Sequence, residues 1–278
     1  MDRTTTGRPG QWSEIPGFRT TAWPGDSVPV PPAQGVDARL VDGAIQYLTT
    51  APHIDLPTDL AIREIPRLDP ADPDALLAFT KAWGPLTQPW GNPAALLPAT
   101  ERASFEGLES FSDPRNDLAP LEVVSTHVRA LRALIAHWHA YNDDRSFEIP
   151  SAWIDNGFRK PRSPGEAWEW WSDILNAALA PFSVRVEVLD GDERPVGFHR
   201  QLVTAYSAMA LQIRNDVALG TPWRVCANEP CNILFARQIG RAEAGQYREK
   251  GVKYCSKNCA RAQVERERRR RKKGQSNG

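Results

Sequence analysis

The sequence predicts an α+β protein with a mostly helical body and a small C-terminal cysteine-rich module that continues into a basic helix. Apolar residues recur at intervals of three and four over several long segments, which is typical of amphipathic helices. All four cysteines fall in one C-terminal window. Charge is also uneven: Arg237 to Lys273 carries 14 Lys or Arg against four acids, although the whole chain balances at 34 against 34. We therefore expect three parts, an arm at 1–36, a body at 37–220 and the cysteine-rich module with its basic helix at 221–273.

The first part, residues 1–36, is rich in proline and glycine. Pro-Gly pairs at 9–10, 16–17 and 24–25 favour turns and make regular structure unlikely. Four apolar residues between Trp12 and Trp23 suggest that the arm is extended over the body, except for its first ten residues. After the arm, brief alternation of apolar and polar residues predicts short strands at Gly43–Thr50 and Leu60–Ile65.

The helices of the body carry stronger signals. Asp72-Pro73 is a helix start, and Gly84-Pro85 is the matching stop. The clearest apolar stripe lies between Leu121 and Tyr141. The predicted elements are helices at 72–82, 121–141, 164–180 and 198–219, a loop from 87 to about 120, and a strand at 184–188.

The cysteines form two close pairs, Cys226-x4-Cys231 and Cys255-x3-Cys259. Two short-spaced pairs suit the tetrahedral coordination of Zn²⁺ by four thiolates. The alternatives are two disulfides or four buried thiols. The N-terminus has no apolar segment typical of a signal peptide, and thiols of a core would be scattered rather than clustered. We predict one structural zinc ion, because four thiolates leave no open position for catalysis.

The segment around the cysteines predicts a treble-clef-like zinc finger. Ile233–Phe235 and Gly251–Tyr254 are expected to be strands, and a helix is expected to begin at Ser256. Three nearby cations, Arg224, Lys253 and Lys257, would offset the net negative charge of a tetrathiolate zinc site.

The helix that follows ends in seven basic residues among the eight positions from Arg266 to Lys273. Favourable interaction with the helix dipole cannot account for so many, and mutual repulsion favours an anionic partner such as a phosphate backbone. A solvated tail and a contact with the acidic body are the alternatives. Two acids, Glu265 and Glu267, are expected to pair with Arg269 and Arg271. The predicted nucleic-acid contacts are Arg261, Arg266, Arg268, Arg269, Arg270, Arg271, Lys272 and Lys273, with Arg237, Arg241 and Arg248 as second contacts.

Three short stretches of this module carry a family resemblance. They are Val225 to Phe235 with its Cys-x4-Cys, Gly251 to Ser256, and the basic helix, and together they resemble the CGNR-type zinc-finger proteins of bacteria. In those proteins a helical-plus-strand domain called ABATE precedes a C-terminal zinc finger, and the family is regarded as transcriptional regulators. The resemblance implies an ABATE-like body and DNA binding. Where the family reads Cys-Gly-Asn-Arg, this chain reads Cys259-Ala260-Arg261.

The body shows no sequence motif for catalysis. His127, His137 and His139 are ten and two residues apart, so a helix does not bring them to one face, and we interpret them as surface or capped histidines. The cluster Trp168-Glu169-Trp170-Trp171 could line a small-molecule pocket, although an aromatic stripe at helical spacing is more often core. Glycine-rich phosphate loops and the common hydrolase motifs are absent. We therefore expect no enzyme activity.

Taken together, the sequence favours a cytoplasmic, zinc-dependent nucleic-acid-binding protein, with DNA as the favoured partner and RNA as an open alternative. Its helical body would sense a ligand or mediate self-association. The competing hypothesis is a zinc-finger protein–protein interaction module without nucleic-acid binding. No apolar run approaches the roughly 18 residues of a transmembrane helix, so no membrane partner is expected.

Overall fold

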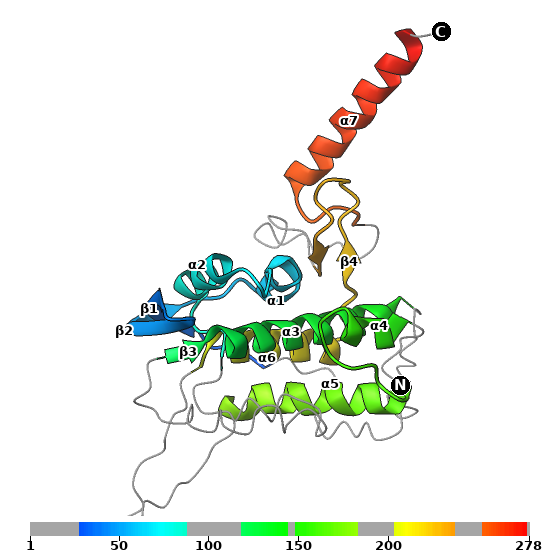
Figure 1. The fold of residues 1–278 in the computed structure, drawn as a ribbon. Coiled ribbons are helices and arrows are strands. Elements are labelled where there is room, and N and C mark those ends of the chain that lie inside the picture. Colours follow the sequence, from blue (N-terminus) through cyan, green and yellow to red (C-terminus); the bar gives the residue numbers. More distant parts are fainter. Residues whose placement is uncertain (1–27, 88–117, 144–147, 183–202, 237–251, 277–278) are drawn as a thin grey trace, which may run out of the picture. The chain divides into compact units, whose positions relative to one another are not determined.

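The computed structural model describes residues 28–87, 118–143, 148–182, 203–236 and 252–276. The chain divides into two compact units, Met1–Gly220 and Thr221–Gly278, and the division falls where the body at 37–220 was expected to meet the module at 221–273 (Figure 1). The first 27 residues of the arm, most of the loop after Thr87, the predicted strand at 184–188 and the three second contacts at 237, 241 and 248 lie outside the described residues.

The first unit contains a three-stranded antiparallel sheet in the order β1-β2-β3. Strands β1 (Ala33–Val41) and β2 (Ala44–Ile54) form a hairpin, and β3 (Leu118–Pro120) pairs with the start of β2. Asp42 and Gly43 both have positive φ, as the two-residue turn of a hairpin requires. The strand predicted at 43–50 is confirmed and is longer than expected. The arm prediction is wrong at its end, because β1 begins at Ala33, directly after Pro31-Pro32.

Helices make up the rest of the first unit (Figure 1). Those predicted at 72–82, 121–141 and 164–180 are confirmed within one residue at each end. The α4 helix was not predicted. The elements are α1 (Leu60–Glu64), η2 (Ile65–Arg67), α2 (Pro73–Trp83), α3 (Leu121–Asn142), α4 (Ile149–Ile154), α5 (Pro164–Leu179), η7 (Ala180–Phe182) and α6 (Ala205–Ala218).

Two predicted elements are corrected. The strand expected at Leu60–Ile65 is the helix α1, in which Leu60, Ala61 and Ile62 are all buried, whereas a strand with one exposed face would bury alternate residues. The helix expected from Phe198 begins instead at Ala205. Thr204 is its N-cap, with backbone angles outside the helical region and a hydroxyl that accepts from the Ser207 N–H.

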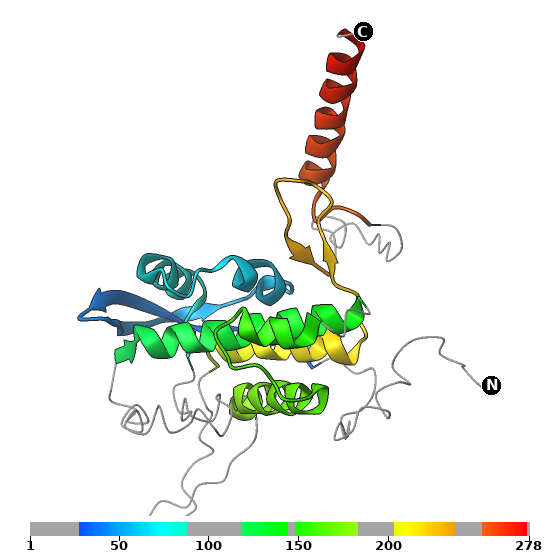
Figure 2. The same cartoon turned by 45° about the vertical axis from the view of Figure 1, so that its right-hand side comes forward.

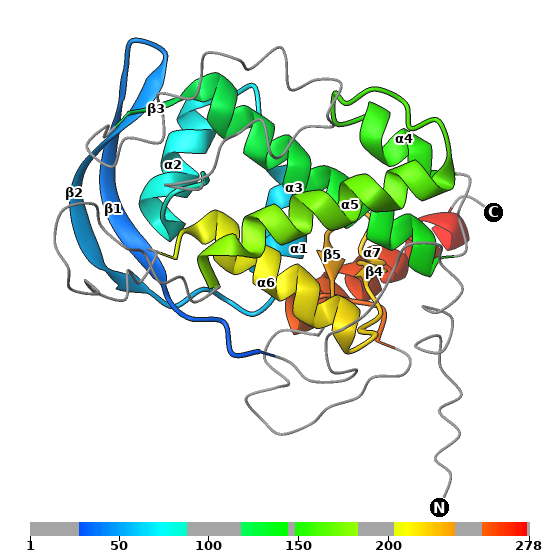
Figure 3. The same ribbon diagram turned by 90° about the horizontal axis from the view of Figure 1, so that it is seen from below.

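The core lies where α3 packs against α2, α4, α5 and α6. Figure 2 shows α3, α5 and α6 stacked on one another, and Figure 3 shows the β1–β2 hairpin at one end of these helices, next to α2. The apolar stripe predicted for α3 is buried, with Val124, Val128 and Leu131 at 0% exposure. Trp138, Trp153 and Trp171 fill the space between α3, α4 and α5 with almost no exposed surface.

Three buried amides connect segments far apart in the sequence. Gln212 on α6 accepts from the Ala61 N–H and donates to the Pro57 carbonyl at 2.7 Å, so it caps α1. Asn215, one turn later, accepts from the Val28 N–H at 3.0 Å and donates to the Val28 carbonyl at 2.7 Å. Gln34 donates its side chain to the Ala51 carbonyl inside the sheet. Each amide replaces hydrogen bonds that water would otherwise provide.

In the described residues of the second unit before its helix, 221–236 and 252–256, regular structure is limited to one short strand pair. Strands β4 (Arg224–Val225) and β5 (Leu234–Phe235) form a short antiparallel pair, and α7 (Lys257–Ser276) follows. The predicted strand at Ile233–Phe235 is confirmed for two residues. The one predicted at Gly251–Tyr254 is wrong for 252–254, which are not in a strand. The Lys253 carbonyl of this segment accepts from the Ala227 N–H at 2.8 Å.

No helix among the described segments is long and apolar enough to cross a membrane.

Candidate metal centre and basic helix

The first cysteine pair sits on a tight backbone turn after β4. The Cys226 N–H donates to the Ile233 carbonyl at 2.9 Å, and the Cys231 N–H donates to the Asn228 carbonyl at 2.7 Å. Asn232 then has φ of 45°, a left-handed conformation that asparagine tolerates. These bonds fold Cys-x4-Cys back on itself, so both sulfurs leave the same end of the β4–β5 hairpin.

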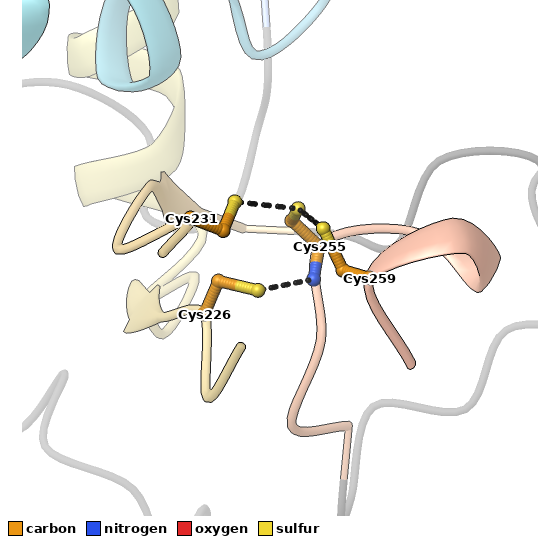
Figure 4. Close-up of side chains that lie close together, drawn as sticks. All are labelled: Cys226, Cys231, Cys255 and Cys259. Atoms are coloured by element: carbon orange, nitrogen blue, oxygen red, sulfur yellow. Dashed lines mark hydrogen bonds between the residues drawn. The ribbon is translucent and has the colours of Figure 1, made fainter. Parts of the chain in front are cut away.

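The second cysteine pair lies at the start of α7. Ser256 caps this helix, since its hydroxyl accepts from the Cys259 N–H at 3.2 Å and its carbonyl accepts from the Ala260 N–H. Cys255 directly precedes the cap, and Cys259 lies in the first turn of α7. The helix start predicted from this spacing is therefore confirmed, and it points both sulfurs toward the first pair (Figure 4).

All four sulfurs converge, and they lie within 4.8 Å of one another. The Sγ–Sγ distances are 3.6 Å from Cys231 to Cys255 and 3.5 Å from Cys255 to Cys259, and the Cys255 N–H points at the sulfur of Cys226 (Figure 4). Four thiolates around a metal at about 2.3 Å would be separated by about 3.8 Å, close to these values. The donor set and its spacing thus fit a four-cysteine metal site.

The protonation equilibria of the thiols differ. Burial raises the pKa values of Cys231 and Cys255. Burial also opposes ionisation of Cys259, but hydrogen bonds from Ser256 and Asn228, together with its cysteine neighbours, lower the pKa of this thiol to about 7. Four thiolates so close together repel one another, so all four ionise together only when a bound cation compensates the charge.

Among the described residues of the second unit, the apolar cluster around the cysteines is small. Phe235 at 0% exposure, Cys226 and Cys255 are the buried members of this cluster, and Val252 and Tyr254 pack against them with partial exposure. A cluster of this size buries too little apolar surface to hold a fold by itself. The cysteines are part of this core, so a bound metal would supply what the apolar contacts lack.

All eight cations predicted to contact nucleic acid lie on α7. Every one is exposed except Arg266, which is partly buried. Glu265 pairs with Arg268 at 2.9 Å and with Arg269 at 3.0 Å, so the predicted Glu265–Arg269 pair is confirmed. The predicted partner of Arg271 is not in place: Glu267 instead accepts from the side chain of Gln263, and no ion pair joins it to Arg271 within the described residues.

An acidic residue that the sequence analysis did not single out contacts this helix. Glu229, in the turn between Cys226 and Cys231, accepts from both terminal nitrogens of Arg270 at 2.8 and 2.6 Å and from Gln263 at 3.4 Å. These bonds, that from Arg270 foremost, lower the pKa of the Glu229 carboxyl. Because Glu229 and Arg270 are 41 positions apart in the sequence, no local sequence pattern predicts their pairing.

His127 and His137 are buried, so the surface position expected for them is wrong. The Nδ1–H of His127 donates to the Val123 carbonyl of its own helix at 2.8 Å, His137 faces Trp168, and His139 lies 3.7 Å from Asp143. They are not among the residues that the structure groups as potential metal ligands, within the part of the chain that it describes. Trp168, Trp170 and Trp171 are buried and pack on neighbouring rings, as core residues do.

Comparisons of this chain with protein-family models, with curated proteins and with solved structures find no match.

Proposed function

We propose that this chain is a zinc-dependent nucleic-acid-binding protein, and specifically a DNA-binding transcriptional regulator whose helical body is a sensor or oligomerisation domain. The observation that carries the proposal is the position of Cys259. This potential metal ligand lies in the first turn of the same helix that bears the eight cations. Ordering the cysteines by metal therefore orders the start of the basic helix.

Zinc is the proposed metal because four thiolates at tetrahedral spacing are its usual structural ligand set. Cys226, Cys231, Cys255 and Cys259 would hold it, with a β hairpin bearing the first pair and a helix start bearing the second. That layout supports a treble-clef-like finger. The closed thiolate set leaves the ion no open position, so its contribution is to folding, and catalysis is not part of the proposal.

The proposed partner follows from the charge of α7. The cations lie along one unbroken helix, and a helix of this kind fits the major groove of B-form DNA, about 12 Å wide. The major groove of A-form RNA is too deep and narrow to admit side chains in the same way. DNA is therefore the proposed partner ahead of duplex RNA, and the cytoplasm is the proposed location.

The test is fluorescence anisotropy of the full-length, zinc-loaded protein on duplex DNA across a salt series. If about six phosphates are neutralised, log K falls with log salt at a slope near −5. Cys226→Ser should remove a metal ligand, loosen α7 and weaken binding at every salt concentration. Leu48→Ala, at an exposed position of β2, is the control that leaves binding unchanged.

Three outcomes would contradict the proposal. Binding that survives Cys226→Ser and chelation would mean that the basic segment acts without the metal. A flat salt response would exclude a phosphate-dominated interface. No binding at low salt would reject the nucleic-acid function and leave the protein–protein interaction module as the better hypothesis.

A further inference from the structure

The turn between the first two cysteines contacts α7 well beyond the metal site. Cys259 is in the first turn of the helix, whereas Arg270 lies eleven residues later, about 16 Å along the axis. The carboxylate of Glu229 binds the guanidinium of Arg270 through two parallel hydrogen bonds. This bidentate geometry fixes the relative orientation of the two side chains as well as the distance between them. A single contact between flexible side chains would not fix the orientation.

Buried residues support the same contact. Gln263, one turn beyond Cys259, is 5% exposed and donates to both Glu229 and Glu267. Arg266 donates to the Gln263 side chain and is itself partly buried. With about 100° of rotation per residue, these residues and Arg270 lie on the same side of the helix as Cys259. This is the inner face of α7.

Four exposed cations of α7 that form no ion pair with a described residue lie on the other side of the helix. Within the described residues, Lys257, Arg261, Arg271 and Lys272 have no acidic partner. Helical geometry places these four within an arc of about 100°, centred roughly opposite the inner face. Arg268 lies in the same arc, and so does Val264, which is 60% exposed. We call this arc the outer face of α7.

We propose that Glu229, Gln263 and Arg270 form a brace that orients α7 on the cysteine module, and that the outer face, through Lys257, Arg261, Arg271 and Lys272, is the surface that contacts duplex DNA. Arg270 is then a positioning residue rather than a phosphate contact. The assignment of the outer face rests on the proposed nucleic-acid function, whereas the brace does not.

The division of α7 into two faces explains why the acidic residue Glu229 contacts a helix that is proposed to bind phosphates. Glu229 carries the one carboxylate in the Cys-x4-Cys turn, and it occupies the planar fork of Arg270 that would bind a phosphate. A duplex approaching the inner face would have to displace that carboxylate and the cysteine module beside it. Among the described residues, the outer-face cations Lys257, Arg261, Arg271 and Lys272 have no such competitor, and they lie around an exposed apolar side chain that could contact the edge of a base.

The experiment compares three full-length, zinc-loaded variants with wild type. Arg270→Gln breaks the brace. The double swap Glu229→Arg with Arg270→Glu restores an ion pair of reversed polarity and keeps the net charge of the wild type. Arg261→Gln with Lys272→Gln removes two cations of the outer face. Each is measured by anisotropy on duplex DNA across a salt series, and by amide hydrogen exchange of α7 without DNA.

Different results are expected for the two faces. Arg270→Gln should speed amide exchange in the second and third turns of α7 and weaken DNA binding about tenfold. The swap should return exchange to near the wild-type rate and affinity to within about threefold. The outer-face variant should leave exchange unchanged and make the salt slope shallower by about 1.8, since each lost phosphate contact contributes about 0.9.

The reverse pattern would overturn the proposal. If the swap stays as weak as Arg270→Gln or weaker, and its salt slope is shallower than that of the wild type, Arg270 contacts phosphate directly. If Arg270→Gln leaves exchange unchanged, there is no brace. An unchanged slope in the outer-face variant rejects that surface. If the wild type itself binds no DNA, the proposed function and the outer-face assignment fail together, and exchange alone decides the brace.

Discussion

Trp153 donates its indole N–H to Nδ1 of His137 at 3.2 Å, deep between α3, α4 and α5. With Nδ1 as the acceptor, the neutral ring carries its proton on Nε2, which has no hydrogen-bond partner among the described residues. The ring of Trp168 lies 4.3 Å from that of His137. The site therefore accommodates a neutral imidazole, and burial lowers the pKa of His137 to about 3. Burial likewise lowers the pKa of His127 to about 4.

Because the pKa values of these two histidines are lowered in the folded body, we expect the body to lose stability in mild acid. In the unfolded chain they take up protons near pH 6.5, whereas in the folded protein they do so only near pH 4 and pH 3. The unfolded state thus binds more protons as the pH falls from about 6.5 towards those values, and folding becomes less favourable. Between pH 7 and pH 5 we expect a loss of about 2 kcal/mol per histidine in the free energy of unfolding, measured by urea titration.

The variant that isolates this effect is His137→Asn. The asparagine oxygen can take the place of Nδ1 as the acceptor for Trp153, and the side chain does not titrate. Its loss of stability between pH 7 and pH 5 should be smaller than that of the wild type by about 2 kcal/mol. Equal losses in the two proteins would show that His137 does not remain neutral in the folded body.

Gly84, which ends α2, should tolerate no side chain. Its φ of 99° and ψ of −178° lie in a region that is essentially restricted to glycine. An added Cβ would also stand 2.4 Å from the carbonyl oxygen of Gln34 in β1. We expect Gly84→Ala to lower the free energy of unfolding by about 3 kcal/mol or more. Gly43→Ala is the matched control, because φ is also positive there but the space is open, and about 1 kcal/mol is expected.

Gln212→Ala should destabilise the body by about 2 kcal/mol. The amide is 5% exposed, and its loss leaves the Ala61 N–H without its partner and removes one of the two hydrogen bonds to the Pro57 carbonyl, which also accepts from the Leu60 N–H. Pro57 lies just before α1 and Ala61 in its first turn, so amide exchange should also speed up there. Gln46→Ala serves for comparison. Among the described residues, the side chain of Gln46 bonds only to the exposed Arg39, and less than about 0.5 kcal/mol should be lost. Similar losses from both variants would contradict the structural role of Gln212.

Local signals in the sequence were sufficient to predict where helices such as α2 begin and that the four cysteine sulfurs converge. Asp72 caps α2 by accepting from Asp74 and Ala75, as Asp-Pro-Asp predicts, and the spacing of the cysteine pairs predicts the convergence of their sulfurs. The strand expected at Leu60–Ile65 failed because tertiary burial against α6, including the cap from Gln212, overrides a brief alternation of residue types.

Local sequence signals did not predict the polar contacts between residues far apart in the sequence. Asn215 and Val28 are 187 positions apart, and Glu229 and Arg270 are 41 apart, so neither pair leaves a periodic pattern. The strand β4, which pairs with β5, was not predicted for a related reason. Arg224–Val225 is too short to register as a strand, and it forms one because the Cys-x4-Cys turn folds β4 and β5 against each other.

The last prediction concerns the hydrogen bond from the side chain of Asn228 to the sulfur of Cys259. Asn228 is 6% exposed, so water has little access to its amide and does not readily replace Cys259 as its partner. Hydrogen bonds to a metal ligand from its neighbours typically contribute 10- to 100-fold to affinity, because they hold the ligand in place and stabilise its charge. Asn228→Ala should therefore weaken zinc binding by about that factor, measured at pH 7 by competition with a chromophoric chelator. Asn258→Ala is the control, an exposed asparagine beside the same cysteine, and it should bind zinc as the wild type does. Equal affinities for all three proteins would mean that the four sulfurs alone determine zinc binding.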